Sequence, residues 1–210
     1  MKLNKYKCII WDFDGVIINS DAIRELGFVE TLNKFPKEQV NLLLNYHRDN
    51  GGLSRYIKFR YFYEKILDVE VTEERINELA KFFSEIMLSK LTEKKLLIQD
   101  SLKFIVEKHK HIVMFIASGS DNNELNYLCK KLGIAKYFKS INGSPTHKNE
   151  IVKTILQDHS NFSKVNFVLI GDSKNDFEAA QANEIDFFGY NNIDLKNICD
   201  YYINSFKNEA

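Results

Sequence analysis

Four apolar runs, each bounded by polar or charged residues, most strongly constrain the fold of this chain. The runs are Lys7–Trp11, Ile112–Ala117, Val165–Ile170 and Ile185–Tyr190. Short, nearly continuous apolar segments are typical of strands buried on both faces of a parallel sheet. Between them, residues 121–133, 149–159 and 175–183 carry apolar side chains at helical spacing. This alternation of strand and helix predicts a doubly wound α/β fold.

Residues 20–90 break the alternation. This segment shows no convincing strand, and its apolar side chains recur at helical intervals; Leu26, Val29 and Leu32 form the first such set. Gly51-Gly52 is the clearest internal break. The pattern predicts three or four helices inserted after the first strand.

A chain of 210 residues is long enough for one core domain and a modest second module. We expect the α/β core to comprise residues 1–18 and 91–210, and residues 19–90 to form a helical cap.

Composition argues against several classes of protein. Lys+Arg and Asp+Glu both total 29, whereas nucleic-acid binders usually carry a basic excess. Cys8, Cys129 and Cys199 are too few and too far apart for a disulfide framework or a zinc site. No apolar stretch approaches membrane-spanning length. A cytoplasmic protein with no nucleic-acid or membrane partner is expected.

The predicted strands lead into residues that can carry chemistry. Asp12 and Asp14 follow the first run, Ser118 follows the second and Asp172 follows the third, while Lys148 begins a predicted helix. In an open parallel sheet, the active site lies outside the carboxyl ends of the strands. The fold would therefore gather these residues in one crevice.

Two of these carboxylates suit a metal ion. Asp12 and Asp172, with the backbone beside Asp14, would offer the hard oxygen ligands that Mg²⁺ prefers, and Mg²⁺ keeps positions for water and phosphate. The same crevice could therefore hold a magnesium ion and a phosphoryl group.

The remaining groups suit phosphoryl chemistry. Lys148 would neutralise phosphate charge, and Ser118 with the amide of Gly119 would donate hydrogen bonds to its oxygens. Asp12 could attack phosphorus and form an aspartyl phosphate. Asp14 could protonate the leaving oxygen and later activate water.

At these residues the chain resembles the haloacid dehalogenase superfamily. Its four motifs resemble, in order, Asp12-Phe13-Asp14-Gly15-Val16, Ser118, Lys148 and Gly171-Asp172-Ser173-Lys174-Asn175-Asp176. The similarity covers about residues 6–18 and 91–200, and the insert resembles the helical cap of the phosphoglycolate phosphatase and β-phosphoglucomutase-like subgroup. Each motif alone is weak or moderate, but all four in order form a strong signal.

The resemblance implies specific roles. Asp12 would be the nucleophile and Asp14 the general acid and base, while Mg²⁺ would contact Asp12, the Asp14 backbone and Asp172. Asp176 would support the metal or Lys148.

Two of these residues have simpler interpretations. Lys148 could be a solvated surface lysine. Asp176 could have no role other than to stabilise the N-terminus of a helix.

The second aspartate of the first motif bears on the reaction. Superfamily members that cleave carbon–halogen bonds lack it, so Asp14 favours phosphate chemistry. The leading hypothesis is hydrolysis of a small phosphate monoester, either a sugar phosphate or a phosphoglycolate-like acid. A phosphosugar mutase and a catalytically silent binding protein are the alternatives.

The cap is expected to choose the substrate. Two arginines, Arg48 and Arg55, flank Gly51-Gly52, and a loop with two glycines can approach a ligand closely. We expect Arg55, and secondarily Arg48, to contact the leaving group. A solvent-facing turn with surface arginines is the alternative. A monomer and a homodimer both remain open.

Overall fold

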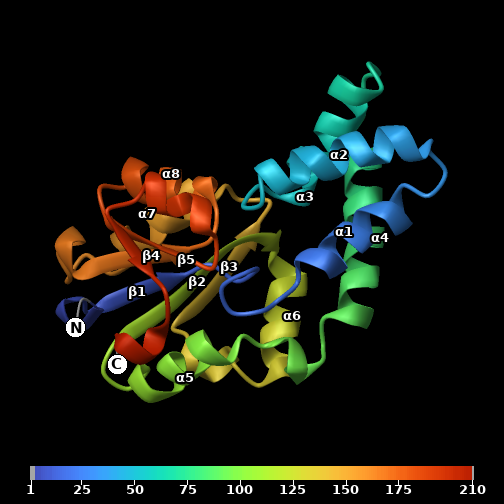
Figure 1. Cartoon of the computed structure of the whole chain (residues 1–210). Coiled ribbons are helices and arrows are strands. Elements are labelled where there is room, and N and C mark those ends of the chain that lie inside the picture. The colour runs from blue at the N-terminus through green and yellow to red at the C-terminus, as the bar shows by residue number, and fades with distance from the viewer. Residues whose placement is uncertain (1–2, 210) are drawn as a thin grey trace.

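The computed structural model describes residues 3–209 and contains one parallel sheet (Figure 1). Its strands, in spatial order, are β3 (Ser140–Ser144), β2 (Val113–Asp121), β1 (Cys8–Trp11), β4 (Phe167–Gly171), β5 (Asp186–Tyr190) and β6 (Tyr201–Ile203). All five neighbouring pairs are parallel. The strand order reverses beside β1, and this is the position where open α/β sheets place their ligands.

Helices cover both faces of the sheet. They are α5 (Gln99–Lys108), α6 (Asn122–Leu132), α7 (Lys148–Asp158) and α8 (Lys174–Ala182). Because strand side chains alternate between faces, Cys8 and Ile10 pack with α7 and α8, whereas Ile9 and Trp11 belong to the larger core that contains α5 and α6. The predicted doubly wound α/β core is confirmed.

The helix ends follow from local sequence. Asp121 is the N-cap of α6, and its carboxylate accepts hydrogen bonds from the amides of Asn123 and Glu124. Gly133 ends it in the left-handed conformation, with φ of 78°. α8 begins one residue earlier than the sequence predicts, and α7 begins at Lys148, the residue expected to start it.

Two strands were not predicted. β3 and β6 lie at the edges of the sheet, where one side has no neighbour. β3 is polar and only partly buried, and β6 has three residues. Neither therefore shows the apolar run of a central strand.

The predicted end of β2 at Ala117 also needs correction. The strand continues to Asp121, but its pairing with β3 is irregular between Ala117 and Asp121. Ser118 and Gly119 therefore lie in the irregular last part of β2, not in a turn beyond it.

The inserted segment is helical, as predicted. It contains α1 (Asp21–Thr31), α2 (Lys37–Asp49), α3 (Arg55–Tyr61), a π-helical turn at Phe62–Ile66 and α4 (Glu73–Lys90). These helices project to one side of the sheet (Figure 1). Phe28 joins them, because its ring centroid lies 5.4 Å from that of Phe59 and 4.6 Å from that of Phe83.

The prediction of which face of α1 is buried is wrong in part. Leu32 is buried, but Leu26 and Val29 are 41% and 42% exposed. Arg24 and Phe28 occupy the buried face instead. Because one of the buried residues is an arginine, the spacing of apolar residues alone does not identify the buried face of α1.

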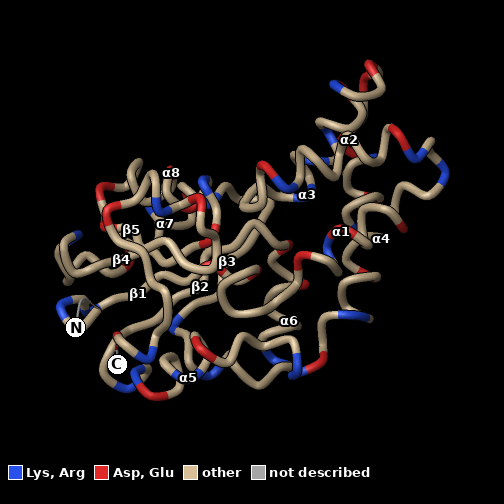
Figure 2. The backbone as a smooth tube through the Cα atoms, in the orientation of Figure 1, with Lys and Arg blue, Asp and Glu red and all other residues tan. Residues whose placement is uncertain are grey.

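Charges of both signs are interspersed along the chain (Figure 2). Within residues 3–209, no helix is both long and apolar enough to cross a membrane.

Candidate active site

The carboxyl end of the sheet brings the predicted residues together. Asp12 directly follows β1, and Asp172 directly follows the neighbouring β4. Lys148 is the first residue of α7, and Asp176 lies in the first turn of α8. Residues far apart in sequence therefore meet because parallel strands end at the same edge.

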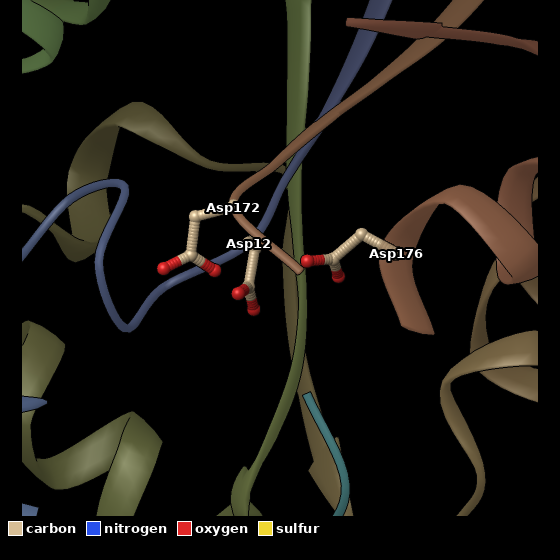
Figure 3. A group of neighbouring side chains, drawn as sticks. All are labelled: Asp12, Asp172 and Asp176. Carbon is tan, nitrogen blue, oxygen red and sulfur yellow. The ribbon is translucent and has the colours of Figure 1, made fainter. Parts of the chain in front are cut away.

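Three carboxylates form the centre of the site. One oxygen from each of Asp12, Asp172 and Asp176 lies within 4.8 Å of the others. Asp12 lies between the other two, and all three extend into the same region (Figure 3). Burial and the neighbouring carboxylates raise the pKa values of Asp12 and Asp172 above those of an ordinary aspartate. The site is therefore poised to gain from a cation.

Lys148 supplies one positive charge to this cluster. Its Nζ donates to Asp12 Oδ1 at 2.8 Å and also to Asp176 Oδ1. Burial opposes its charge, but the attraction of these two carboxylates is stronger and raises the pKa of Lys148. Lys148 is thus a buried, charged residue and not a surface lysine.

Asp176 both caps the N-terminus of α8 and binds Lys148. Its Oδ2 accepts hydrogen bonds from the amide and hydroxyl of Ser173, which completes a capping box at the start of α8. Its Oδ1 accepts from Lys148. Both oxygens are engaged, so the freer carboxylates of the cluster belong to Asp12 and Asp172.

These two carboxylates fit a magnesium ion by the chemistry of their donors. Each offers hard oxygen ligands, and burial together with the neighbouring carboxylates raises their pKa values despite the opposing charge of Lys148. Gly15 allows the first loop to approach them: its φ is 71°, and a Cβ there would lie 1.9 Å from Asp172 Oδ2. Asn191 and Asn192 hold the backbone carbonyls of Gly15 and Asp172 by side-chain hydrogen bonds, both 2.8 Å long.

Asp14 forms no hydrogen bond with Lys148; its hydrogen-bond partners are Ser20, Arg24 and Ser120. Arg24 Nε donates to its Oδ1 at 3.0 Å, and the hydroxyls of Ser20 and Ser120 also donate to its carboxylate. Burial raises the pKa of Asp14, but the guanidinium of Arg24 and the two hydroxyls outweigh burial and lower it to about 2. Asp14 is therefore ionised in this arrangement.

The predicted phosphate-binding residues on β2 lie beside the inserted helices. Ser118 is buried, and its Oγ accepts a hydrogen bond from the Ser120 amide at 3.0 Å. A Cβ at Gly119 would lie 2.4 Å from the Gly52 carbonyl oxygen. A side chain at position 119 would therefore push away the Gly51-Gly52 loop.

A small cavity lies between this loop and the carboxylates. Its volume is about 60 Å³. Its lining includes Asp12, Asp172 and Ser118 from the core, and Gly51-Gly52 and Arg55 from the insert. The loop thus faces the candidate site, and the solvent-facing alternative is wrong for it.

The two predicted cap arginines differ in position. Arg55 is 4% exposed, and its Nη1 donates to Glu124 Oε2 at 2.6 Å and to Ser84 Oγ at 2.7 Å. Arg48 has a side chain 54% exposed, and it binds Glu25 through two hydrogen bonds. Arg48 is absent from the residues that line the cavity among those the structure describes.

Four further charged residues near the site were not predicted. Arg24 joins Asp14 to Glu124, and Asp21 of α1 and Lys58 of α3 line the cavity. The sequence offers a weak signal for Arg24 and Lys58: each lies within one helical turn of a buried phenylalanine, Phe28 or Phe59. Glu124 offers no such signal, because it could equally be a solvated residue in the first turn of α6.

Comparison with known families gives a match over most of the chain. The sequence profile of the family described as "Haloacid dehalogenase-like hydrolase" matches residues 9–190. A search of curated proteins finds no matching sequence.

Solved structures with the same fold include three with high coverage. A β-phosphoglucomutase from Clostridium difficile has 15% identity and a TM-score of 0.77, with 98% of this chain and 93% of that chain covered. A predicted phosphatase from Clostridium acetobutylicum has 17% identity and a TM-score of 0.76, with 97% and 96% covered. A predicted phosphoglycolate phosphatase from Haemophilus somnus has 16% identity and a TM-score of 0.71, with 98% and 96% covered. At such identities the similarity establishes the shared fold, including the inserted helices.

Proposed function

The chain belongs to the haloacid dehalogenase-like hydrolase family, and we propose that it is a magnesium-dependent phosphatase acting on a small phosphate monoester. The observation that carries this proposal is the position of Asp12. It lies at the end of a central strand, in contact with Lys148 and beside Asp172. A nucleophile, a fixed cation and a further metal-binding carboxylate are the groups that phosphoryl transfer through an acyl phosphate requires.

In the first proposed step, a carboxylate oxygen of Asp12 attacks phosphorus. The new bond joins this oxygen to phosphorus, and the bond from phosphorus to the ester oxygen breaks. The ester oxygen leaves as an alcohol when Asp14 gives it a proton. Lys148, Ser118 and the Gly119 amide bind the phosphoryl oxygens.

In the second step, water attacks the aspartyl phosphate. Asp14 takes a proton from this water as its oxygen bonds to phosphorus, and the bond between phosphorus and Asp12 breaks. Inorganic phosphate leaves, and Asp12 is regenerated. A bound Mg²⁺, held by Asp12, the Asp14 backbone and Asp172, would offset negative charge on the phosphoryl group.

The contacts of Asp14 set a condition on this cycle. With a pKa of about 2, Asp14 is ionised at neutral pH, so in this arrangement it holds no proton to donate. Donation in the first step requires Arg24 to withdraw from its carboxylate. Because Arg24 lies on α1, the first inserted helix, we expect movement of that helix to release Asp14 for protonation.

The proposal is tested by phosphate release from a broad panel of phosphate monoesters, with Mg²⁺ and with excess chelator. We expect release only with Mg²⁺. If no ester is hydrolysed, a sugar-phosphate panel followed by phosphorus NMR would reveal transfer of phosphate within one molecule, as in a mutase. No reaction in either assay would favour the silent binding protein.

Replacing Asp172 with Asn should weaken magnesium binding. The amide keeps one oxygen but loses the negative charge that attracts a hard cation. We expect the Mg²⁺ concentration for half-maximal activity to rise at least about tenfold. A calorimetric Mg²⁺ titration measures the affinity independently of turnover, and unchanged affinity would contradict a metal-binding role for Asp172.

Replacing Asp14 with Asn should separate metal binding from catalysis. The backbone carbonyl remains, so magnesium affinity should be retained. The side chain no longer transfers a proton, and we expect turnover to fall by about 10²- to 10⁴-fold. Steady-state kinetics measures the loss of turnover, and a Mg²⁺ titration measures the retained magnesium affinity. Near-normal turnover would refute the proposed acid–base role.

A further inference from the structure

Glu124 is a carboxylate of the core that joins two arginines of the inserted helices. It lies in the first turn of α6, is 2% exposed, and accepts hydrogen bonds from Arg24 of α1 at 2.5 Å and from Arg55 of α3 at 2.6 Å. Burial raises the pKa of Glu124, but the two guanidinium groups outweigh burial and hold it below its usual range. Glu124 is therefore ionised, and each of its oxygens binds one cation of the insert.

Both arginines line the cavity, but neither lacks a countercharge. Arg24 forms ion pairs with Asp14 and Glu124, and Arg55 forms one with Glu124. A guanidinium group without such a partner would attract a second anionic group on the substrate, in addition to the phosphoryl group. The carboxylate of Glu124 opposes that attraction from within the protein.

The charges in and around the cavity leave no positive excess. Among residues 3–209, the cations that line the cavity or bind its carboxylates are Arg24, Arg55, Lys58 and Lys148. The carboxylates that line it or bind these cations are Asp12, Asp14, Asp21, Glu124, Asp172 and Asp176. With all of these groups ionised, six negative charges face four positive ones, and one bound Mg²⁺ would make the balance even. A second anionic group on the substrate would therefore lose its hydration without meeting an unbalanced cation.

Lys58 does not reverse this balance, although it forms no ion pair within the described part of the chain. Its Nζ donates to His47 Nδ1 at 2.8 Å and to the Gly51 carbonyl at 3.1 Å. Burial lowers the pKa of Lys58 to about 7; Arg24 and Arg55 add to this effect, and Asp14 opposes it. The amine is therefore only partly charged near neutral pH.

We propose that Glu124 determines specificity by restricting the site to esters in which the transferred phosphate is the only anionic group. This inference rests on the proposed phosphatase function. The cap-side lining of the cavity also includes the apolar side chains of Phe28, Leu53 and Phe83, which suit an uncharged leaving group. The preferred substrate class is the phosphate monoester of a small neutral alcohol.

The same charge balance bears on the mutase alternative. A mutase that works through an aspartyl phosphate passes through a bisphosphate, because the phosphoryl group returns to a molecule that already carries one. The second phosphate would need its own cations on the cap side, where Glu124 offsets the arginines. Hydrolysis of a monophosphate makes no such demand.

Two esters of equal chain length test the inference. Glycerol 1-phosphate carries a neutral hydroxymethyl group where 3-phosphoglycerate carries a carboxylate. With Mg²⁺, we expect kcat/KM of the wild-type enzyme to favour glycerol 1-phosphate at least about tenfold, because the carboxylate is desolvated without a free cation. Equal values, or a preference for the acid, would overturn the inference.

Glu124→Gln tests whether the charge of Glu124 sets this preference. Glutamine keeps an acceptor oxygen but no longer offsets the arginines. We expect the ratio of kcat/KM, neutral ester over acid, to fall at least about tenfold. Assays are run at a temperature at which circular dichroism shows the variant folded. Glu25→Gln is the matched control: it removes a carboxylate from Arg48, outside the cavity, and should keep the wild-type ratio. An unchanged ratio in Glu124→Gln would refute the role of Glu124.

Two variants of Arg55 separate the effect of charge from a structural effect. The double variant Glu124→Gln/Arg55→Gln removes one charge of each sign, so we expect its ratio to return towards the wild-type value. Arg55→Gln alone leaves Glu124 with one arginine and should raise the ratio, and this test does not depend on the stability of Glu124→Gln. A ratio that falls in Arg55→Gln, or stays low in the double variant, would overturn the inference.

Binding measurements distinguish failure of this inference from failure of the proposed function. If neither ester is hydrolysed, the phosphatase proposal fails for these esters, and calorimetric titration of both compounds with Mg²⁺ then tests Glu124 alone. Tighter binding of glycerol 1-phosphate by the wild type, with the difference reduced in Glu124→Gln, would support the inference. Equal affinities, or binding of neither compound, would overturn it.

Discussion

Replacing Asp12 with Asn should abolish phosphate release while the protein stays folded. The amide has the shape of the carboxylate but lacks the negative oxygen that attacks phosphorus. We expect kcat to fall by at least about 10⁴-fold, because loss of a nucleophile removes the whole covalent route. Phosphate release on the best ester of the panel, at saturating Mg²⁺, measures the effect.

Stability controls separate this loss from unfolding. Asp12 is one of three clustered carboxylates, and Lys148 keeps Asp176 as a partner in the variant. We therefore expect circular dichroism spectra and melting temperature close to those of the wild type. Asp158→Asn, at the exposed end of α7, is the control that should retain activity. Substantial turnover by folded Asp12→Asn would contradict the nucleophile assignment.

Replacing Glu124 with Gln should destabilise the protein strongly. Glu124 is 2% exposed, and its two oxygens accept from Arg24 at 2.5 Å and from Arg55 at 2.6 Å. Removing its charge leaves two buried guanidinium groups with one carboxylate, Asp14, which pairs with Arg24 and not with Arg55. Breaking a buried ion pair on one side costs about 3–5 kcal/mol of unfolding free energy. Urea unfolding monitored by circular dichroism measures this difference.

Glu25→Gln is a control matched in chemistry but not in burial. Glu25 binds Arg48 through two hydrogen bonds of 2.6 and 2.8 Å, and the Arg48 side chain is 54% exposed. Exposed ion pairs contribute about 0–1 kcal/mol. If Glu124→Gln and Glu25→Gln both lost the same small amount of unfolding free energy, the buried arginines would have other partners. Glu124 would then not link the insert to the core.

The chemical centre could be predicted from sequence because each of its residues follows a strong local signal. Asp12 and Asp172 directly follow buried strands, and parallel strands bring their carboxyl ends to one edge. Lys148 and Asp176 begin helices that return from that edge. The motif order then places all four residues together without knowledge of any side-chain contact.

The charged residues of the cap side could not be predicted in the same way. Arg24 meets Glu124 across 100 positions of sequence, and Arg55 meets it across 69. Their pairing depends on how the inserted helices dock onto α6, and no periodic pattern encodes that. Lys58 is concealed for a related reason, because a buried lysine interrupts an apolar stripe and looks like a surface position.

The edges of the sheet were missed for a different physical reason. A central strand is buried on both faces and therefore reads as an apolar run, whereas β3 has the sequence Ser-Ile-Asn-Gly-Ser. Its pairing with β2 is supplied by backbone groups, which every residue carries. Hydrophobic pattern alone cannot reveal such a strand.

The most direct test of the account is to trap the phosphorylated enzyme. The best ester would be mixed with enzyme and Mg²⁺, quenched in acid within the first turnover, and the protein digested for mass spectrometry. The account predicts one phosphoryl group on the peptide containing Asp12, absent from Asp12→Asn and lost on incubation with hydroxylamine, which cleaves acyl phosphates. A phosphoryl group on a serine or histidine, or release of phosphate with Asp12 never modified, would contradict it.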